Sequence, residues 1–265
     1  MVHPCPTRRS IPGLALALVL TLALAVPADS GQAQDGCHTT VFSSGRVGSV
    51  GDGRTLMLAD GREVRLAGLA PDSGGRKALR LLAGGKRVQL ARLGAGGKPD
   101  IDRYGRLVAF VTVDSAPQSL QMALLTVGQA RVLGRIGDKT CAAALLATEN
   151  AARTAKRGLW ANPNFAPLSS ENLSGLEAAR GHFALVEGQV LSVRESGGTI
   201  YVNFGRRWTR DFTVTILKRQ RRAFAAAGID LKQLEGRRIR VRGFIERRGG
   251  PIIAASAPEQ IEPID

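Results

Sequence analysis

The sequence predicts an α+β protein made mainly of short strands, arranged as two small twisted β-barrels with helices packed against them. Short alternating apolar and polar segments recur through residues 41–113 and again through residues 183–255. Three runs with helical apolar spacing accompany the first group of strands. A stretch rich in Pro, Asn and Ser, residues 161–170, lies between the two groups and predicts a boundary between domains.

The first half combines strands with helices. Strand patterns cover residues 41–50, 55–58, 63–67, 87–93 and 106–113. The pairs Asp52-Gly53 and Asp60-Gly61 predict hairpin turns between the first three strands. Helical patterns cover residues 76–82, 119–127 and 138–157, the last with Asp138 as its N-cap and Gly158 as its stop. We therefore expect one domain over residues 38–165.

The second half has its own strand set. Strand patterns cover residues 183–193, 199–204 and 211–216, a basic helix covers 217–227, and strands follow at 238–245 and 251–255. Three strands, a helix and two strands is the order of an OB-type barrel. GRVGSV at residues 45–50 also matches GQVLSV at residues 188–193, which fits two barrels of the same kind. We expect a linker over residues 166–179 and a basic OB-like domain over residues 180–265.

The N-terminus has the pattern of a secretory signal peptide. Arg8 and Arg9 precede a short apolar run at residues 11–26, and small residues lead to a cleavage position near Ala33. An uncleaved anchor is the alternative. No later apolar run is long enough to span a membrane. We predict an exported protein, periplasmic or extracellular, with residues 1–33 removed.

The cysteines agree with export. Cys5 would leave with the signal peptide, and Cys37 and Cys141 would remain as an even pair in an oxidising compartment. We predict a disulfide between them; two unpaired buried thiols are the alternative. With His38 and His182 as the remaining histidines, a Cys-based zinc site has too few ligands.

The charge is strongly positive and unevenly spread. The chain carries a net charge of +15, and residues 206–248 hold twelve Arg and two Lys against four acidic residues. This density suits a polyanion such as nucleic acid, anionic lipid or acidic polysaccharide. The alternative is compositional bias, because 30 Arg against 7 Lys in an Ala- and Gly-rich chain is typical of a high-GC genome.

Several blocks of the first half occur in a recognisable order. They are DGRT at 52–55, VRLAGLAPD at 64–72, DRYGRLVAF at 102–110, the helix at 120–125 with GQARV at 128–132, and AKRGLW at 155–160. Together they resemble the staphylococcal-nuclease-like (thermonuclease) family. The resemblance implies an OB-type barrel with three helices that hydrolyses phosphodiesters in DNA and RNA. In that chemistry carboxylates hold one Ca²⁺, a Glu activates water, and two Arg hold the phosphate.

The arginines of the family motif are present in this sequence, whereas most of its metal-binding carboxylates are not. Arg65 and Arg106 match the two phosphate-holding arginines, and Asp72 is the candidate for the water-activating acid. Arg54 stands where the family has a metal-ligating Asp, and the loop after Arg65 is one residue short and lacks another. We expect no cofactor, with Ca²⁺ held by Asp52 and Asp72 as the alternative. The predicted phosphate-binding set in this half is Arg54, Arg103 and Tyr104, beside the catalytic candidates.

These substitutions leave three interpretations open. Phosphodiester hydrolysis persists by a weakened or altered route, or Arg54, Arg65 and Arg106 line a pocket that only binds phosphate. The third is that the arginines serve ordinary ion pairs, Arg65 with Glu63 or Asp60 and Arg106 with Asp102.

The second half interleaves aromatic and basic residues. Phe204 and Phe212 have strand spacing and are expected in the core. Trp208, in a loop, is the candidate for stacking on bases, and the flanking cations Arg206, Arg207 and Arg210 are candidates for phosphate contacts. The arginines of the basic helix, Arg219, Arg221 and Arg222, contact phosphates or form a solvated face.

We therefore expect an exported thermonuclease-like protein that binds DNA or RNA, with hydrolysis weakened or lost. The alternative is a non-catalytic nucleic-acid- or polyanion-binding protein of the cell envelope.

Overall fold

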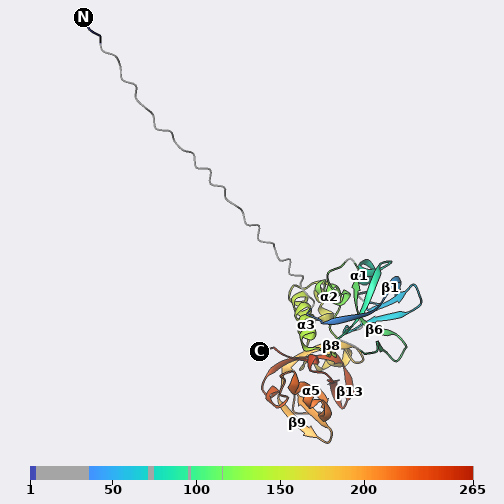
Figure 1. The fold of residues 1–265 in the computed structure, drawn as a ribbon. Helices are drawn as coiled ribbons and strands as arrows, with labels where there is room; N and C mark the ends of the chain where they lie inside the picture. The colour runs from blue at the N-terminus through green and yellow to red at the C-terminus, as the bar shows by residue number, and fades with distance from the viewer. Residues whose placement is uncertain (4–35, 71–74, 95–96, 115, 265) are drawn as a thin grey trace. The chain divides into compact units, whose positions relative to one another are not determined.

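The computed structural model describes residues 1–3, 36–70, 75–94, 97–114 and 116–264 (Figure 1). The described part from Gly36 onward belongs to one compact unit. It is an α+β structure: a six-stranded sheet with helices comes first in the chain, and two further sheets follow. The described helices include none long and apolar enough to cross a membrane.

Hydrogen bonds close the first sheet into a ring. Its strands are β1 (Thr39–Val50), β2 (Thr55–Leu58), β3 (Glu63–Leu66), β4 (Arg87–Leu93), β5 (Asp100–Ile101) and β6 (Leu107–Val113). The order is β3-β2-β1-β4-β6-β5, and an additional parallel pairing joins β3 to β6. β1 serves two neighbours because it is long. Its residues 39–46 pair with β4 and its residues 47–50 with β2, with a register shift between Val47 and Ser49.

Three helices accompany this sheet: α1 (Gly75–Ala83), α2 (Leu120–Thr126) and α3 (Lys139–Thr154). The predicted N-cap Asp138 is confirmed, and Ser119, expected as the first residue of its helix, is the N-cap instead. The Ser119 side chain accepts a hydrogen bond from the backbone N of Met122, and the Asp138 carboxylate accepts one from Cys141. α3 ends at Thr154, earlier than expected, and Gly158 begins the short 3₁₀ helix η1 (Gly158–Ala161). Apolar side chains of the sheet and the helices form one buried cluster.

The second half contains two sheets. One has the order β13-β14-β11-β10-β9 and the other β15-β12-β8-β7. The strands are β7 (Leu168–Ser169), β8 (Phe183–Gln189), β9 (Ser192–Ser196), β10 (Thr199–Asn203), β11 (Thr213–Leu217), β12 (Arg238–Phe244), β13 (Glu246–Arg248), β14 (Gly250–Ala254) and β15 (Ile261–Pro263). β11 pairs with β14 in parallel, and β8 pairs with β12 antiparallel.

Some expected elements differ from the structure. The strand expected over 183–193 is divided into β8 and β9. The basic helix expected over 217–227 consists of η3 (Lys218–Gln220) and α5 (Arg221–Ala226). The segment expected as a linker, 166–179, holds β7 and α4 (Leu173–Ala178), whose N-cap Asn172 accepts a hydrogen bond from the backbone N of Gly175. Further 3₁₀ helices are η2 (Pro163–Phe165), η4 (Lys232–Leu234) and η5 (Pro258–Gln260).

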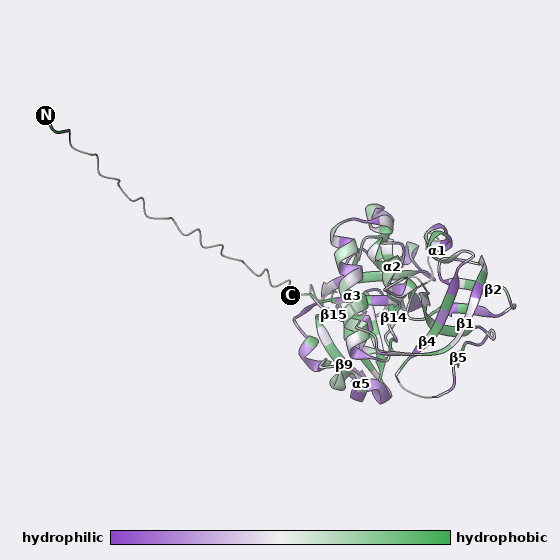
Figure 2. Ribbon diagram, turned by 45° about the horizontal axis from the view of Figure 1, so that its top comes forward, coloured by the Kyte–Doolittle hydropathy of each residue, from purple (hydrophilic) through white to green (hydrophobic). Residues whose placement is uncertain are grey.

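Apolar side chains divide into separate buried clusters. One belongs to the first sheet and its helices, and another to the later strands with α4 and α5. A third, smaller cluster contains Ala70, Ala152 and Trp160 from the first half with Phe183 and Leu185 from β8. Trp160 is thus a packing residue. In Figure 2 strands β1, β2 and β4 carry both hydrophobic and hydrophilic residues, the pattern of a sheet with one buried face.

The predicted disulfide is present. Cys37 and Cys141 are bonded across 104 positions of sequence and tie the start of β1 to the first turn of α3. Cys141 is buried in the first apolar cluster.

Candidate phosphate-binding site

The topology of three strands brings Arg54, Arg65 and Arg106 together. Arg54 directly precedes β2, Arg65 lies in β3, and Arg106 directly precedes β6. β3 is the middle strand, because it pairs with β2 on one side and with β6 on the other. The residue after Arg54, Thr55, is the register partner of Arg65, and Val64 is the partner of Leu107. Three arginines far apart in sequence are therefore close neighbours in the fold.

Asp102 is the shared acceptor of two of these arginines. Its Oδ2 accepts hydrogen bonds from Nε of Arg106 at 2.9 Å and from Nη1 of Arg65 at 3.3 Å. Its Oδ1 accepts from the backbone N of Tyr104 at 2.9 Å and of Arg106 at 3.2 Å. The side-chain bond from Arg106 holds the pKa of Asp102 far below its ordinary value. The same contact raises the pKa of Arg106. Asp102 is therefore ionised and occupied by internal donors.

Arg54 is held differently. Its Nη1 donates to the carbonyl oxygen of Leu69 at 2.9 Å, and its backbone N donates to Oδ1 of Asp52 at 2.8 Å. Its buried Nε finds no partner among the described residues. Burial, followed by repulsion from the charge of Arg65, lowers the pKa of Arg54 to about 10. The guanidinium of Arg54 remains charged at neutral pH, although the positive charges of the neighbouring arginines repel it.

Tyr104 lies at the exposed side of the same turn. Its ring is 64% exposed, and the guanidinium carbons of Arg103 and Arg106 lie 4.7 and 5.0 Å from the ring centroid. Nη2 of Arg103 also donates to the Tyr104 hydroxyl at 2.6 Å. An open depression beside this ring is lined by Glu63, Arg62 and Arg106, among others. Arg62 is already paired with Asp60. The sequence analysis did not select Arg62 or Glu63 as site residues.

The described carboxylates do not fit a calcium site. Ca²⁺ takes roughly six to eight oxygen ligands, several of them anionic. Within the described ranges, no group of three or more His, Cys, Asp or Glu side chains is placed to hold a metal ion. Asp102 is taken by two arginines, and Arg54 occupies the turn that holds Asp52. Asp72, the predicted water-activating acid and second metal ligand, lies outside the described residues. We derive no step through calcium.

The second predicted group lies in the loop between β10 and β11. Trp208 is 68% exposed, and Arg206, Arg207 and Arg210 are exposed beside it. Phe204 and Phe212 pack together with ring centroids 5.0 Å apart, and Phe212 is fully buried, as expected for core residues. The structure adds Arg247 and Arg248 of β13, because the hairpin turn after β13 reaches the Trp208 loop. Nothing in the local sequence marks these two arginines as part of the group, because β13 is short and polar throughout.

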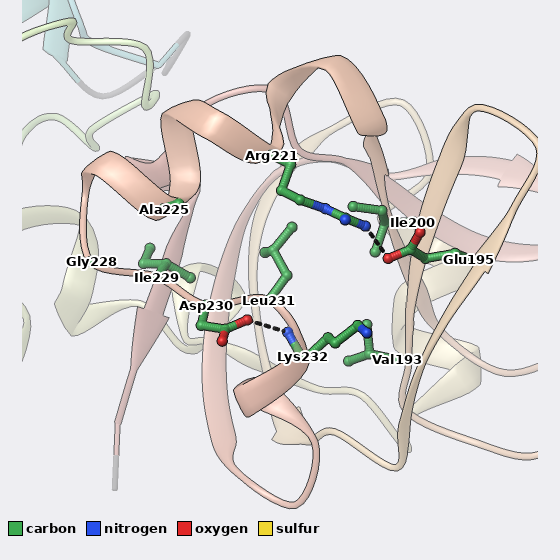
Figure 3. Close-up of a pocket in the computed structure, with 10 residues that line it drawn as sticks. All are labelled: Val193, Glu195, Ile200, Arg221, Ala225, Gly228, Ile229, Asp230, Leu231 and Lys232. Atoms are coloured by element: carbon green, nitrogen blue, oxygen red, sulfur yellow. Dashed lines mark hydrogen bonds and ion pairs between the residues drawn. The ribbon is translucent and has the colours of Figure 1, made fainter.

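A separate hollow contains none of the predicted catalytic or metal-binding residues. It measures about 390 Å³ and lies between α5 and the strands β9 and β10 (Figure 3). Val193, Ile200 and Leu231 give it an apolar lining. Three of its charged groups are occupied: Arg221 pairs with Glu195, and Asp230 accepts a hydrogen bond from the backbone N of Lys232 (Figure 3).

One comparison with known proteins identifies part of the chain. Residues 76–162 match the family described as Staphylococcal nuclease homologue. The chain therefore contains a staphylococcal-nuclease-like domain at these residues. The match covers the turn with Asp102, Tyr104 and Arg106, whereas Arg54 and Arg65 precede it. A search of curated proteins gave no significant match.

Proposed function

We propose that the nuclease-like domain binds nucleic-acid phosphodiesters through Arg54, Arg65 and Arg106. The observation that carries this proposal is the convergence of three guanidinium groups at three neighbouring strands. Burial, and after it the charge of Arg65, lowers the pKa of one of them, Arg54. A phosphodiester carries one negative charge, and guanidinium groups bind its oxygens through paired hydrogen bonds. An anion at this place relieves the repulsion that Arg54 experiences.

We further propose that hydrolysis is weakened or lost. Calcium-assisted attack needs a metal that bridges carboxylates and phosphate, and a base that activates water. Arg54 replaces one expected carboxylate, and Asp102 is neutralised by Arg65 and Arg106. Asp72 is the remaining candidate for the base. The arginines still stabilise negative charge on a bound phosphate. We therefore expect the domain to retain nucleic-acid binding even where hydrolysis is weakened or lost.

The second half is proposed to be a second OB-type domain. The pairing of its strands supports this. In the first sheet, β1 pairs with β2 and β4, and β3 pairs in parallel with β6. In the second half, β8 pairs antiparallel with β12, and β11 pairs in parallel with β14. The matching segments 45–50 and 188–193 both interrupt a first strand, the former by a register shift and the latter by the break between β8 and β9.

The proposed location is outside the cytoplasm, after removal of residues 1–33. The disulfide between Cys37 and Cys141 supports this, because disulfides persist in oxidising compartments. The signal peptide itself is proposed from its sequence pattern. The proposed domain boundaries stay at 38–165 and 180–265.

The alternative function is a non-catalytic binder of another envelope polyanion. The observation that favours it is the excess of exposed arginine in the second half, where ten of the twelve Arg at residues 206–248 are exposed. Acidic polysaccharide and anionic lipid meet the same charges as nucleic acid does. Competition experiments separate these partners.

The test of the proposed function is a binding and nuclease assay on single-stranded DNA, with calcium and with chelator. We expect salt-sensitive binding that persists in chelator, with little cutting. Arg65→Ala should weaken binding about 10- to 100-fold, because a charge-assisted hydrogen bond is lost. Arg80→Ala, which removes an exposed arginine of α1, is the control and should change affinity little.

Each outcome decides between the interpretations. Calcium-dependent cutting that Arg65→Ala abolishes would contradict the proposed loss of hydrolysis. Absence of binding to both DNA and RNA near physiological salt would favour the envelope alternative. Equal binding by Arg65→Ala and the unmodified protein would remove the arginine site from the proposal.

A further inference from the structure

We propose that a second nucleic-acid site, specific for single strands, lies on the surface formed by the β10–β11 loop and the β13–β14 hairpin. We call this surface the Trp208 patch; its residues are Arg206, Arg207, Trp208, Arg210, Arg247 and Arg248. The proposal shares its ligand class with the proposed function and rests on it in that respect. It differs from the proposed function in the residues that bind and in the way they recognise the ligand. Here a base stacks on the exposed indole of Trp208.

The indole is supported from one side by the hairpin turn. A Cβ placed on Gly249 would lie 3.2 Å from Cζ3 and 3.5 Å from Cε3 of Trp208, so the six-membered ring rests close to the glycine backbone. Gly249 has φ of 83°, the left-handed conformation that glycine adopts without strain. A side chain at this position would displace the ring. The turn therefore holds Trp208 in place while 68% of the residue stays exposed.

The loop itself is tightly folded. The backbone N of Arg207 donates to Oδ2 of Asp211 at 2.8 Å, and the backbone N of Asp211 donates back to the carbonyl of Arg207 at 2.7 Å. Arg210 N donates to the same carbonyl at 2.9 Å. These bonds keep the arginines on either side of Trp208. Such order lowers the entropy that a ligand must offset on binding.

The charges of this loop are not neutralised internally. Among the described residues, no acceptor pairs with the side chains of Arg206, Arg207 and Arg210. Their surroundings differ from those of Arg65 and Arg106, which share Asp102.

The hairpin arginines are only loosely paired. Nη1 of Arg247 lies 3.7 Å from Oε1 of Glu177, and Nη2 of Arg248 lies 3.8 Å from Oε2 of Glu246, all four side chains being well exposed. Exposed pairs at such distances are weak. The Trp208 patch therefore presents a strongly positive surface around one aromatic ring.

The chemistry favours a single nucleic-acid strand over other polyanions. Bases stack on aromatic side chains while cations contact the phosphates, and this needs unpaired bases, which a duplex does not expose. A membrane-inserting loop requires several apolar residues at its tip, whereas residues 205–211 read GRRWTRD. A polysaccharide would also meet the arginines, but it has no aromatic base, and the abasic oligonucleotide of the test below distinguishes recognition of a base from recognition of charge and sugar.

The test is a titration of the full protein with a single-stranded oligothymidylate in chelator, followed by tryptophan fluorescence and anisotropy. Trp160 is buried, so quenching should come from Trp208 and disappear in Trp208→Phe or Trp208→Ala. Trp208→Ala should weaken binding about 5- to 150-fold, the range measured for loss of one stacked base. An abasic oligonucleotide of equal length and charge should bind correspondingly less tightly and should not quench.

Charge is tested by matched double variants. Arg206→Ala/Arg207→Ala should lower the slope of log affinity against log salt by about 1.4, because two phosphate contacts are lost. Arg219→Ala/Arg222→Ala, which removes two exposed arginines from η3 and α5, is the control and should leave the slope nearly unchanged. The titration is repeated in an Arg54→Ala/Arg65→Ala background. Quenching that survives there separates the Trp208 patch from the first site.

Several results would overturn the proposal. They are unchanged oligothymidylate affinity in Trp208→Ala, equal binding of the abasic strand, or the same loss in both double variants. Phosphatidylglycerol vesicles that shift Trp208 emission more strongly than the oligonucleotide would assign the patch to a membrane surface instead. Far-ultraviolet circular dichroism of each variant checks that the fold is retained.

Discussion

Arg65 and Arg106 share the carboxylate of Asp102, whereas the side chains of Arg206 and Arg207 have no acidic partner among the described residues. The sequence shows both groups as arginines in basic segments. Their environments differ because the β3–β6 pairing brings Asp102 to the first group. The interpretation in which Arg106 pairs with Asp102 is confirmed, and Arg65 pairs with the same residue rather than with Glu63 or Asp60. An internal ion pair does not prevent an arginine from also binding phosphate.

Asp102→Asn should destabilise the protein at neutral pH. The folded-state pKa of Asp102 is depressed by Arg106, so its stabilising effect is fully present above its ordinary value of 3.8 and is lost as pH falls through the folded-state pKa. The difference in unfolding free energy between the two proteins should therefore shrink below pH 3.8. Urea denaturation at a series of pH values measures it.

Asp114→Asn provides the comparison, because its carboxylate lies 3.7 Å from an exposed Arg87. It should change stability little at any pH. A difference between Asp102→Asn and the unmodified protein that stays constant down to the acid limit would contradict the proposed role of the Asp102 charge.

At the scale of elements, strands with a clear alternation of apolar and polar residues were predicted, whereas strands without it were not. β2 and β3 are preceded by Asp-Gly turns and alternate clearly, so their existence and approximate bounds follow from local sequence. β13 reads ERR and has no apolar residue to mark a buried face. It forms because its neighbour β14 offers backbone partners. The segment 166–179 likewise gains β7 because β8 lies beside it.

One buried ion pair joins elements of the two halves. Arg242 of β12 and Glu149 of α3 are both fully buried, with Nη1 of Arg242 3.0 Å from Oε2 of Glu149. Arg242 also donates to Glu262 of β15 and to the carbonyl of Val132. Burial alone would lower the pKa of Arg242, but the two carboxylates outweigh it and raise the pKa. The pair is a tertiary contact that no local pattern predicts.

Glu149→Gln should lower the unfolding free energy by about 3–5 kcal/mol, because a buried guanidinium loses one of its two carboxylate partners. Arg242→Met should have a similar effect, because the buried carboxylate of Glu149 then loses the guanidinium that it pairs with. The double variant Glu149→Gln/Arg242→Met should recover part of the loss, since no unpaired charge remains buried between them. Chemical denaturation of the four proteins gives the coupling energy.

A control pair is Arg180 and Glu177, which are exposed and 3.1 Å apart. Their double-mutant cycle should give about 0–1 kcal/mol. Additive effects of Glu149→Gln and Arg242→Met would contradict a direct interaction between them.

At the scale of the whole molecule, a disulfide and a small apolar cluster connect distant segments. The cluster places Trp160 against Phe183 and Leu185, and Arg131 donates to the carbonyl of Phe183 at 3.1 Å. The disulfide joins positions 104 residues apart. Both act over long sequence separations, where closing the chain costs the most conformational entropy.

Replacing both cysteines, Cys37→Ala/Cys141→Ala, should lower the unfolding free energy by about 4–5 kcal/mol. The loop-entropy model gives this range for a closed loop of this length. Thermal and urea unfolding measure the loss, and reduction of the unmodified protein with dithiothreitol should reproduce it. Stability that is unaffected by both treatments would contradict a stabilising role for the disulfide.

The sequence by itself determined the strand-rich α+β class, the Cys37–Cys141 pair and the arginines of the first site. These follow from local alternation, from the number of cysteines, and from residue spacing within short blocks. The tertiary structure alone decided which arginines are neutralised, that β13 brings Arg247 and Arg248 to Trp208, and that Arg242 meets Glu149. These contacts join residues far apart in the chain, and the free energy that forms them comes from burial and pairing in the assembled fold.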